Sequence, residues 1–128
     1  MESVAEKKSK TVVAGASTNP TRYAYLAAQM LQEYGYDFVP VGIKKGELFG
    51  QPILDFRELP KIDHVDTVTL YIGPDNQKVW YDYLISLKPR RVIFNPGTEN
   101  FEFAQRLKKE GIEVTEACTL VLLRSHQY

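Results

Sequence analysis

Short runs of β-branched, aromatic and other apolar residues alternate along the chain with segments whose apolar positions recur every three or four residues. The short runs predict strands, and the three-to-four spacing predicts helices that each bury one face. Strands are predicted at residues 11–14, 37–41, 65–72, 91–94 and 112–114, with a short edge strand within 47–55. Helices are predicted at residues 22–34, 75–87 and 99–109, with one helical turn at 55–59.

This alternation predicts a single α/β domain with a doubly wound, mostly parallel sheet of about five strands flanked by helices. A length of 128 residues, 44% of them apolar, suits one core. The first ten residues are polar and are predicted to be a flexible lead-in, which leaves residues 11–128 for the domain. Pro40 lacks a ladder N–H, so we expect strand pairing to stop there. The apolar run at 118–123 must pack on the sheet or on a second subunit, and the sequence leaves both open.

Charge and cysteine content exclude several function classes. Sixteen basic and sixteen acidic residues balance to zero, which gives no reason to expect a nucleic-acid or membrane partner. The N-terminal residues are too polar for a signal peptide or a membrane span. Cys118 is the single cysteine, and no Cys/His cluster has zinc spacing, so we expect no disulfide, no metal and a reducing, cytoplasmic location.

The most informative segment is VVAGASTNPTR at residues 12–22, where the first strand meets the first helix. Backbone N–H groups at such a helix N-terminus bind phosphate, Pro20 suits the first helical turn, and Arg22 adds a planar cation. Ser17, Thr18 or Asn19 are expected to cap the helix or to donate hydrogen bonds to phosphate oxygens. The alternative is a tight, capped strand-to-helix connection that binds nothing.

Two departures from the dinucleotide-binding signature narrow the choice of ligand. Only Gly15 matches G-x-G-x-x-G, because Ser17 and Pro20 replace the second and third glycines. Lys44 and Lys45 follow the second strand, where an NAD site normally has an acidic residue that bonds the ribose. A basic pair suits an extra phosphate on the adenosine ribose, as in NADP or coenzyme A, although loop lysines are often merely solvated.

The turn after the fourth predicted strand, residues 91–94, adds the last motif of a resemblance to a known family. The segment RVIFNPGTEN at 91–100, with GASTNP at 15–20 and VPV at 39–41, resembles the small stand-alone CoA-binding proteins, and the resemblance covers residues 10–123. Their Rossmann-like domain is similar to the nucleotide-binding domain of the succinyl-CoA synthetase alpha subunit. That subunit uses a phosphorylated histidine in a second domain. Here only His64 and His126 are present, neither in a predicted ligand loop, so ligase activity is not expected.

The resemblance implies that the chain binds coenzyme A or an acyl-CoA without catalysis of its own. It implies that the pyrophosphate lies on the 15–19 loop and the first helix N-terminus, that adenine lies beside the second strand end, and that the 71–74 loop flanks both. The Asn-Pro-Gly turn would line the route of the pantetheine arm, although it and Tyr71 also fit a purely structural role. The residues so assigned are Gly15, Ala16, Ser17, Thr18, Asn19, Arg22, Tyr23, Pro40, Val41, Gly42, Lys44, Tyr71, Ile72, Asn95, Pro96 and Gly97.

Two other classes of function stay open. Cys118 is the only candidate nucleophile for a thiol-dependent ester or thioester hydrolase, with His126 or His64 as the base and Glu116 or Glu113 nearby; the alternative is a buried structural thiol. An interaction module is the other class, in which the apolar tail or an aromatic face forms a homodimer or partner surface instead of core. The aromatic residues concerned are Tyr34, Tyr36, Trp80, Tyr81 and Tyr83.

Overall fold

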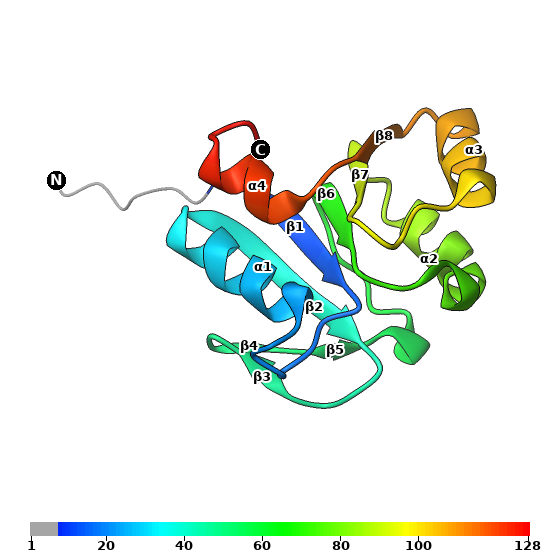
Figure 1. The fold of residues 1–128 in the computed structure, drawn as a ribbon. Helices are drawn as coiled ribbons and strands as arrows, with labels where there is room; N and C mark the ends of the chain where they lie inside the picture. Colours follow the sequence, from blue (N-terminus) through cyan, green and yellow to red (C-terminus); the bar gives the residue numbers. More distant parts are fainter. Residues whose placement is uncertain (1–7) are drawn as a thin grey trace, which may run out of the picture.

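The structure is a computed structural model that describes residues 8–128. Six parallel strands form one sheet in the order β5-β2-β1-β6-β7-β8, and a two-stranded antiparallel hairpin, β3-β4, lies beside it (Figure 1). The strands are β1 (Lys8–Ala14), β2 (Tyr36–Gly42), β3 (Glu47–Leu48), β4 (Gln51–Pro52), β5 (Leu54–Asp55), β6 (Val65–Leu70), β7 (Arg91–Phe94) and β8 (Glu113–Glu116). The predicted single α/β domain, a Rossmann-like fold, is confirmed.

Helices cover both faces of this sheet. They are α1 (Tyr23–Glu33), α2 (Tyr81–Ser86), α3 (Phe101–Lys109) and α4 (Thr119–Arg124), with 3-10 turns η1 (Phe56–Glu58), η2 (Pro74–Asn76) and η3 (Lys78–Trp80). Residues of α1 and α4 share one apolar cluster, and residues of α2 and α3 share the other. In α1, Ala24, Ala27 and Ala28 are buried, and their small side chains let the helix lie close to the sheet.

The strand order reverses direction at β1, which creates a topological switch point, the place where open α/β sheets bind ligands. The chain runs from β1 outward to β2 and β5, then returns to place β6 on the other side of β1 and continues outward to β7 and β8. The connections after β1 and β6 therefore diverge from neighbouring strand ends. In open α/β sheets, the crevice between such diverging connections is the usual ligand site.

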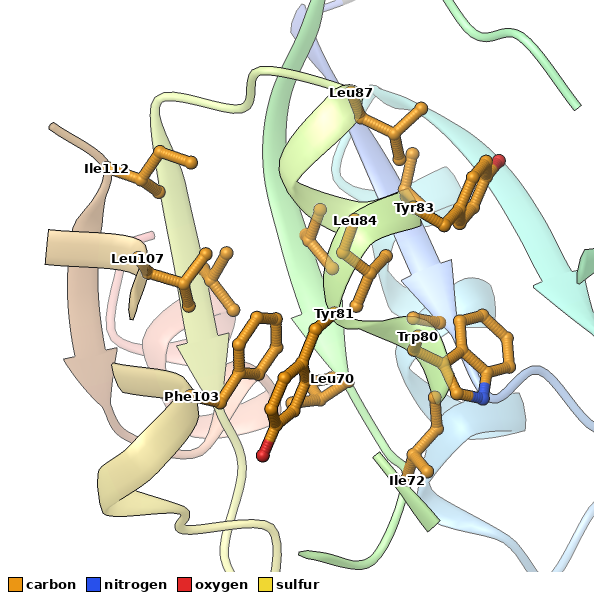
Figure 2. Packing of buried hydrophobic residues seen from close by; sticks show 14 of the residues in the cluster. Leu70, Ile72, Trp80, Tyr81, Tyr83, Leu84, Leu87, Phe103, Leu107 and Ile112 are labelled. Atoms are coloured by element: carbon orange, nitrogen blue, oxygen red, sulfur yellow. The ribbon is translucent and has the colours of Figure 1, made fainter. Parts of the chain in front are cut away.

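Aromatic stacking fills the core on the α2 and α3 face. The Trp80 ring stacks on Phe56 with centroids 3.9 Å apart, and Tyr81 stacks on Phe103 at 4.3 Å. Figure 2 shows Trp80, Tyr81 and Phe103 among the aliphatic side chains of the same cluster. Trp80, Tyr81 and Tyr83 are buried, so these three aromatic residues pack inside the domain and leave no aromatic partner surface at their positions.

Several element predictions need correction. Residues 8–10, predicted as part of the flexible lead-in, belong to β1, which begins at Lys8; the rest of that predicted segment, residues 1–7, lies outside the described residues. The sheet has six strands because the two-residue β5 pairs with the end of β2. Pro40 does not end its strand: it aligns with Val13. The Val41 carbonyl faces β1, so the backbone nitrogen of the preceding residue, Pro40, faces the other neighbouring strand, β5. β5 pairs with β2 only from Val41 onward, so the missing N–H of Pro40 costs no hydrogen bond in the sheet.

The predicted 75–87 helix is only partly helical. It consists of η2, η3 and the short α2, because the side chain of Gln77 turns inward and Trp80 N–H bonds the Gln77 carbonyl in 3-10 fashion. Val79, which the three-to-four spacing places on the apolar side of the predicted helix, is 74% exposed. The apolar tail forms α4, which packs against α1 within the same chain, so its burial needs no second subunit. None of the helices in residues 8–128 has the length and apolar character of a membrane span.

Candidate functional site

A cleft of about 730 Å³ opens among the loops that follow β1, β2, β6 and β7. Most residues assigned to the cofactor from sequence line it: Gly15, Ala16, Ser17, Thr18, Asn19, Arg22, Tyr23, Lys44, Tyr71, Ile72, Pro96 and Gly97. The cleft also contains Lys45 and Gly73, from the basic pair and the 71–74 loop considered in the sequence analysis. Residues that sequence reasoning did not consider for the site are Ala24, Ile43, Ile53, Asn76, Trp80 and Thr98. Four loops that are distant in sequence therefore meet at one concave surface.

The end of β1 is held close to its neighbours on both sides. The N–H groups of Gly15 and Ala16 both donate to the Val41 carbonyl, at 2.9 and 3.0 Å. Gly15 has φ +91°, and a Cβ there would lie 3.0 Å from Ile72 Cγ1 and 3.1 Å from the Tyr71 carbonyl group. Only glycine meets both conditions, so Gly15 lets the β1 and β6 ends approach each other beneath the cleft.

The helix N-terminus beyond this turn is uncapped. Arg22 is the N-cap residue of α1, makes no side-chain cap bond, and is followed by no acidic residue in the first turn. The prediction that Ser17, Thr18 or Asn19 caps the helix is wrong. Asn19 instead closes the preceding turn, since its Oδ1 accepts from the Thr21 N–H and hydroxyl and its carbonyl accepts from the Arg22 N–H.

This arrangement leaves backbone donors without a partner in residues that line the cleft. Within residues 8–128, no hydrogen bond uses the backbone N–H of Ser17, Thr18, Tyr23 or Ala24. All four residues line the cleft. Uncapped N–H groups at a helix N-terminus carry the positive end of the helix dipole, which favours an anion.

The side chains that line the cleft add positive charge and no negative charge. Arg22, Lys44 and Lys45 are exposed in it, and no Asp or Glu lines it. None of these three cations takes part in the salt bridges found among residues 8–128. Because the whole chain carries a formal net charge of zero, the cleft is a local concentration of positive charge that suits a phosphorylated ligand.

The loop that carries Lys44 and Lys45, here called the lysine loop (residues 43–46), packs directly on the loop after β1. The Gly46 carbonyl accepts from Ile53 N–H at 2.8 Å, and a Cβ on Gly46 would lie 2.5 Å from Thr18 Cγ2. A side chain at position 46 would therefore separate the two loops. This contact places Lys44 and Lys45 on the same side of the cleft as the N-terminus of α1.

Gln77 connects the loop after β6, to which it belongs, with the loop after β7. Its side chain is completely buried, and its Nε2 donates to the Ile72 carbonyl at 2.8 Å and to the Thr98 carbonyl at 2.7 Å. Its Oε1 accepts from Asn100 Nδ2, while Asn100 Oδ1 caps α3 by accepting from Phe103 N–H. The loops after β6 and β7 thus keep a fixed spacing. No sequence motif marks Gln77, because both carbonyl partners become neighbours only in the folded chain.

Four residues assigned to the cofactor lie beneath the cleft instead of in it. Pro40 and Val41 are buried in β2, and a Cβ on Gly42 would lie 3.0 Å from the Ala16 carbonyl oxygen. Asn95 is buried: its Nδ2 donates to Thr69 Oγ1 and the Leu70 carbonyl, and its Oδ1 accepts from the Thr119 N–H that begins α4. These residues support the loops that form the cleft.

Tyr71 belongs to the cleft and to the core at once. It lines the cleft, yet it packs against the α1 and α4 cluster, and its buried hydroxyl has no hydrogen-bond partner within residues 8–128. Desolvation by burial raises the pKa of Tyr71 to about 12. The phenol is therefore neutral at physiological pH and cannot act as a general base there.

The groups considered for thiol chemistry are not assembled. Cys118 is half-buried at the start of α4, whereas His126 follows the other end of that helix and packs on Tyr34 with ring centroids 6.1 Å apart. His64 directly precedes β6, at the end of the sheet opposite the cleft. Glu113 accepts a hydrogen bond from Arg90, and no hydrogen bond among residues 8–128 links Cys118 to a histidine or to Glu116. Nowhere in the same residues do three metal-ligating side chains come together.

The fold and this cleft define a Rossmann-like α/β domain with a site at the switch point of its sheet. The chain belongs to the CoA binding domain family, whose model matches residues 9–124. The resemblance drawn from the sequence motifs is thereby confirmed, and the family supports a CoA-binding role.

Solved structures agree with this assignment. An uncharacterized protein of known crystal structure is 52% identical over 98% of this chain and 100% of that one, with a TM-score of 0.90. A protein from Thermus thermophilus is 27% identical over 94% of this chain and 90% of that one, with a TM-score of 0.82. A dinucleotide-forming acetyl-coenzyme A synthetase from Ca. Korarchaeum cryptofilum shares the fold at 20% identity and a TM-score of 0.69, over 87% of this chain and 26% of that one. The comparison with curated proteins gave no match.

Proposed function

We propose that this protein binds coenzyme A or an acyl-CoA in the cleft, as a ligand-binding domain without catalysis of its own. The observation that carries the proposal is the combination of unpartnered N–H groups at the start of α1 with an acid-free, cation-lined cleft at the sheet switch point. Family membership selects CoA among the phosphorylated ligands that such a cleft suits.

The ligand groups can be assigned to separate parts of the cleft. The pyrophosphate takes the free N–H groups of Ser17 and Thr18 and the N-terminus of α1, beside Arg22. The 3′-phosphate of the ribose takes Lys44 and Lys45. The adenine, expected from sequence beside residues 40–42, lies next to Ile43 and Ile53, because Pro40 and Val41 are buried beneath the surface that those two isoleucines form.

The opposite side of the cleft accommodates the remainder of the ligand. The pantetheine arm passes Pro96 and Gly97, both exposed in the loop after β7. No nucleophile or acid/base pair lines this route within the described residues. The thiol or acyl group would therefore be held without being activated. A cytoplasmic location, the absence of nucleic-acid and membrane partners, and a homodimer remain predictions.

Isothermal titration calorimetry with CoA, dephospho-CoA, NAD and NADP tests the proposal directly. CoA is expected to bind most tightly, with dephospho-CoA weaker because it lacks the phosphate that meets the lysines. Binding of NAD or NADP with no response to CoA would contradict it.

Matched variants locate the phosphate sites. The double variant Lys44→Ala/Lys45→Ala is expected to weaken CoA binding and to leave dephospho-CoA binding nearly unchanged. Lys108→Ala/Lys109→Ala removes two exposed lysines from the last turn of α3, outside the cleft, and serves as the control for net charge. Arg22→Ala is expected to weaken both ligands equally, because both carry the pyrophosphate. Equal losses in the two lysine double variants would refute the assignment of the 3′-phosphate.

A further inference from the structure

Arg57 makes an unusual set of contacts just outside the cleft. Its backbone N–H and its Nε both donate to Asp55 Oδ1, at 2.9 and 3.0 Å, and its second guanidinium nitrogen donates to Asp55 Oδ2 at 3.1 Å. That same nitrogen also donates to the Ile43 carbonyl at 3.2 Å. Arg57 itself does not line the cleft. One exposed guanidinium thus links the end of β5 to the first residue of the lysine loop.

The Ile43 contact fixes one end of the lysine loop, residues 43–46. The other end is fixed by the Ile53 N–H bond to the Gly46 carbonyl and by the close approach of Gly46 to Thr18. Lys44 and Lys45 lie between these two anchors. Without the guanidinium, Ile43 would be held only through its chain link to Gly42 of β2, and holding both ammonium groups near one phosphate would cost more conformational entropy.

Asp55 gives the same contact an electrostatic consequence. It pairs in register with Gly42, so its carboxylate stands at the strand end next to β2. The hydrogen bonds from Arg57 hold the pKa of Asp55 below its ordinary value, and the nearby positive charges of Arg57 and Lys45 act in the same direction. An acidic side chain near this end of a nucleotide-binding sheet ordinarily bonds ribose hydroxyls and repels a ribose phosphate. Here both carboxylate oxygens of Asp55 are occupied by Arg57.

From these contacts we infer that Arg57 is a positioning residue that determines selectivity for a 3′-phosphorylated adenosine. It acts through other residues, by anchoring the lysine loop and by occupying the carboxylate of Asp55. The inference rests on the proposed function, since it concerns the same cleft. It assigns the choice between CoA and its dephosphorylated form to a side chain that touches neither ligand.

The test compares the affinities of CoA and dephospho-CoA in Arg57→Ala by calorimetry. Arg57 is 66% exposed, so the variant is expected to fold, which circular dichroism and thermal unfolding check. We expect the ratio of the two affinities to fall about threefold or more, the size of one exposed charge interaction, while dephospho-CoA binding changes less than twofold. The second variant, Asp55→Asn/Arg57→Ala, also removes the negative charge of Asp55, which Arg57→Ala leaves without its partner. It is expected to restore part of the preference for CoA over dephospho-CoA.

Arg90→Ala is the matched control. Arg90 is 56% exposed and donates to both carboxylate oxygens of Asp66. This contact lies where β6 and β7 begin, at the ends of the strands opposite the cleft. Its loss should leave the ratio unchanged. An affinity ratio that stays unchanged in Arg57→Ala, whether both ligands bind more weakly or neither does, overturns the inference and leaves the proposed function standing. A wild-type protein that does not prefer CoA overturns it as well, and a wild-type protein that binds neither ligand refutes the proposed function.

Discussion

Replacing Gln77 with leucine tests whether the cleft depends on the single side chain that joins two of its loops. Leucine is similar in size but cannot donate to the Ile72 and Thr98 carbonyls or accept from Asn100. Three hydrogen bonds of about 0.5–1.5 kcal/mol each are lost, so the variant should be destabilised by about 2–4 kcal/mol. Total stabilities of about 5–15 kcal/mol leave most molecules folded. The unfolding midpoint should fall on the order of 10 °C.

CoA affinity should fall together with stability, because the loops after β6 and β7 lose their fixed spacing. Thermal unfolding and calorimetry on the same preparation measure both effects. Gln32→Leu is the control, since Gln32 is exposed on α1 and its side chain makes no hydrogen bond within residues 8–128. Unfolding and CoA binding of Gln77→Leu that match those of Gln32→Leu would show that the bridge does not position the loops.

Gln77→Glu changes the hydrogen-bonding capacity of the side chain while keeping its size. A carboxylate would face two carbonyl oxygens, whereas the protonated acid donates one hydrogen bond and recovers part of the bridge. Folding therefore raises the pKa of this glutamate. Relative to the wild type, the variant should be least destabilised at low pH and should lose stability as pH rises from the ordinary Glu pKa toward the raised value. Stability of this variant that follows the wild-type pH profile would contradict the reasoning.

Three other perturbations follow from the same structure. Gly15→Ala should cost about 1–3 kcal/mol in urea unfolding, because position 15 combines positive φ with close neighbours; Gly35→Ala, with positive φ and nothing within 4 Å, should cost less. Asn95→Ala should speed amide hydrogen exchange in α4, whose first N–H it bonds, and equal exchange rates in the two proteins would count against that anchor. Asp66 has a pKa lowered chiefly by hydrogen bonds from Arg90, so its contribution to stability is present above the ordinary value of 3.8 and is lost as pH falls through the lowered value. Asp66→Asn should remove that part of the acid dependence in a pH series of thermal unfolding, and an unchanged dependence would refute the assignment.

The sequence predicted the central elements because their burial is continuous. β6 and β7 consist of almost uninterrupted buried residues, which is the pattern of strands covered on both faces. The 75–87 segment was harder. Its apolar spacing fits a helix, but Gln77 is buried and bonds the Ile72 carbonyl, five residues earlier, and the Thr98 carbonyl in the loop after β7, whereas Val79 is exposed. Such bonds depend on tertiary neighbours that periodicity does not record.

The same distinction applies to the site. The cleft loops could be predicted because parallel strands end at one edge of the sheet. The burial of individual residues could not be predicted, since Gly42 and Asn95 are adjacent in sequence to cleft residues yet are buried beneath the cleft. Arg57 was missed because its two partners, Asp55 and Ile43, belong to different segments.

The position of β1 also has a consequence for how the chain is synthesised. Among the strands of this sheet, β1 is the first to be synthesised, yet it lies in the middle of the sheet between β2 and β6. After β2 and β5 have emerged, one edge of β1 still has no neighbour until residues 65–70 follow. Exposed strand edges invite pairing with other chains, and parallel pairing across a long intervening segment is slow. The interval before β6 emerges is therefore when the nascent chain is most open to misassembly.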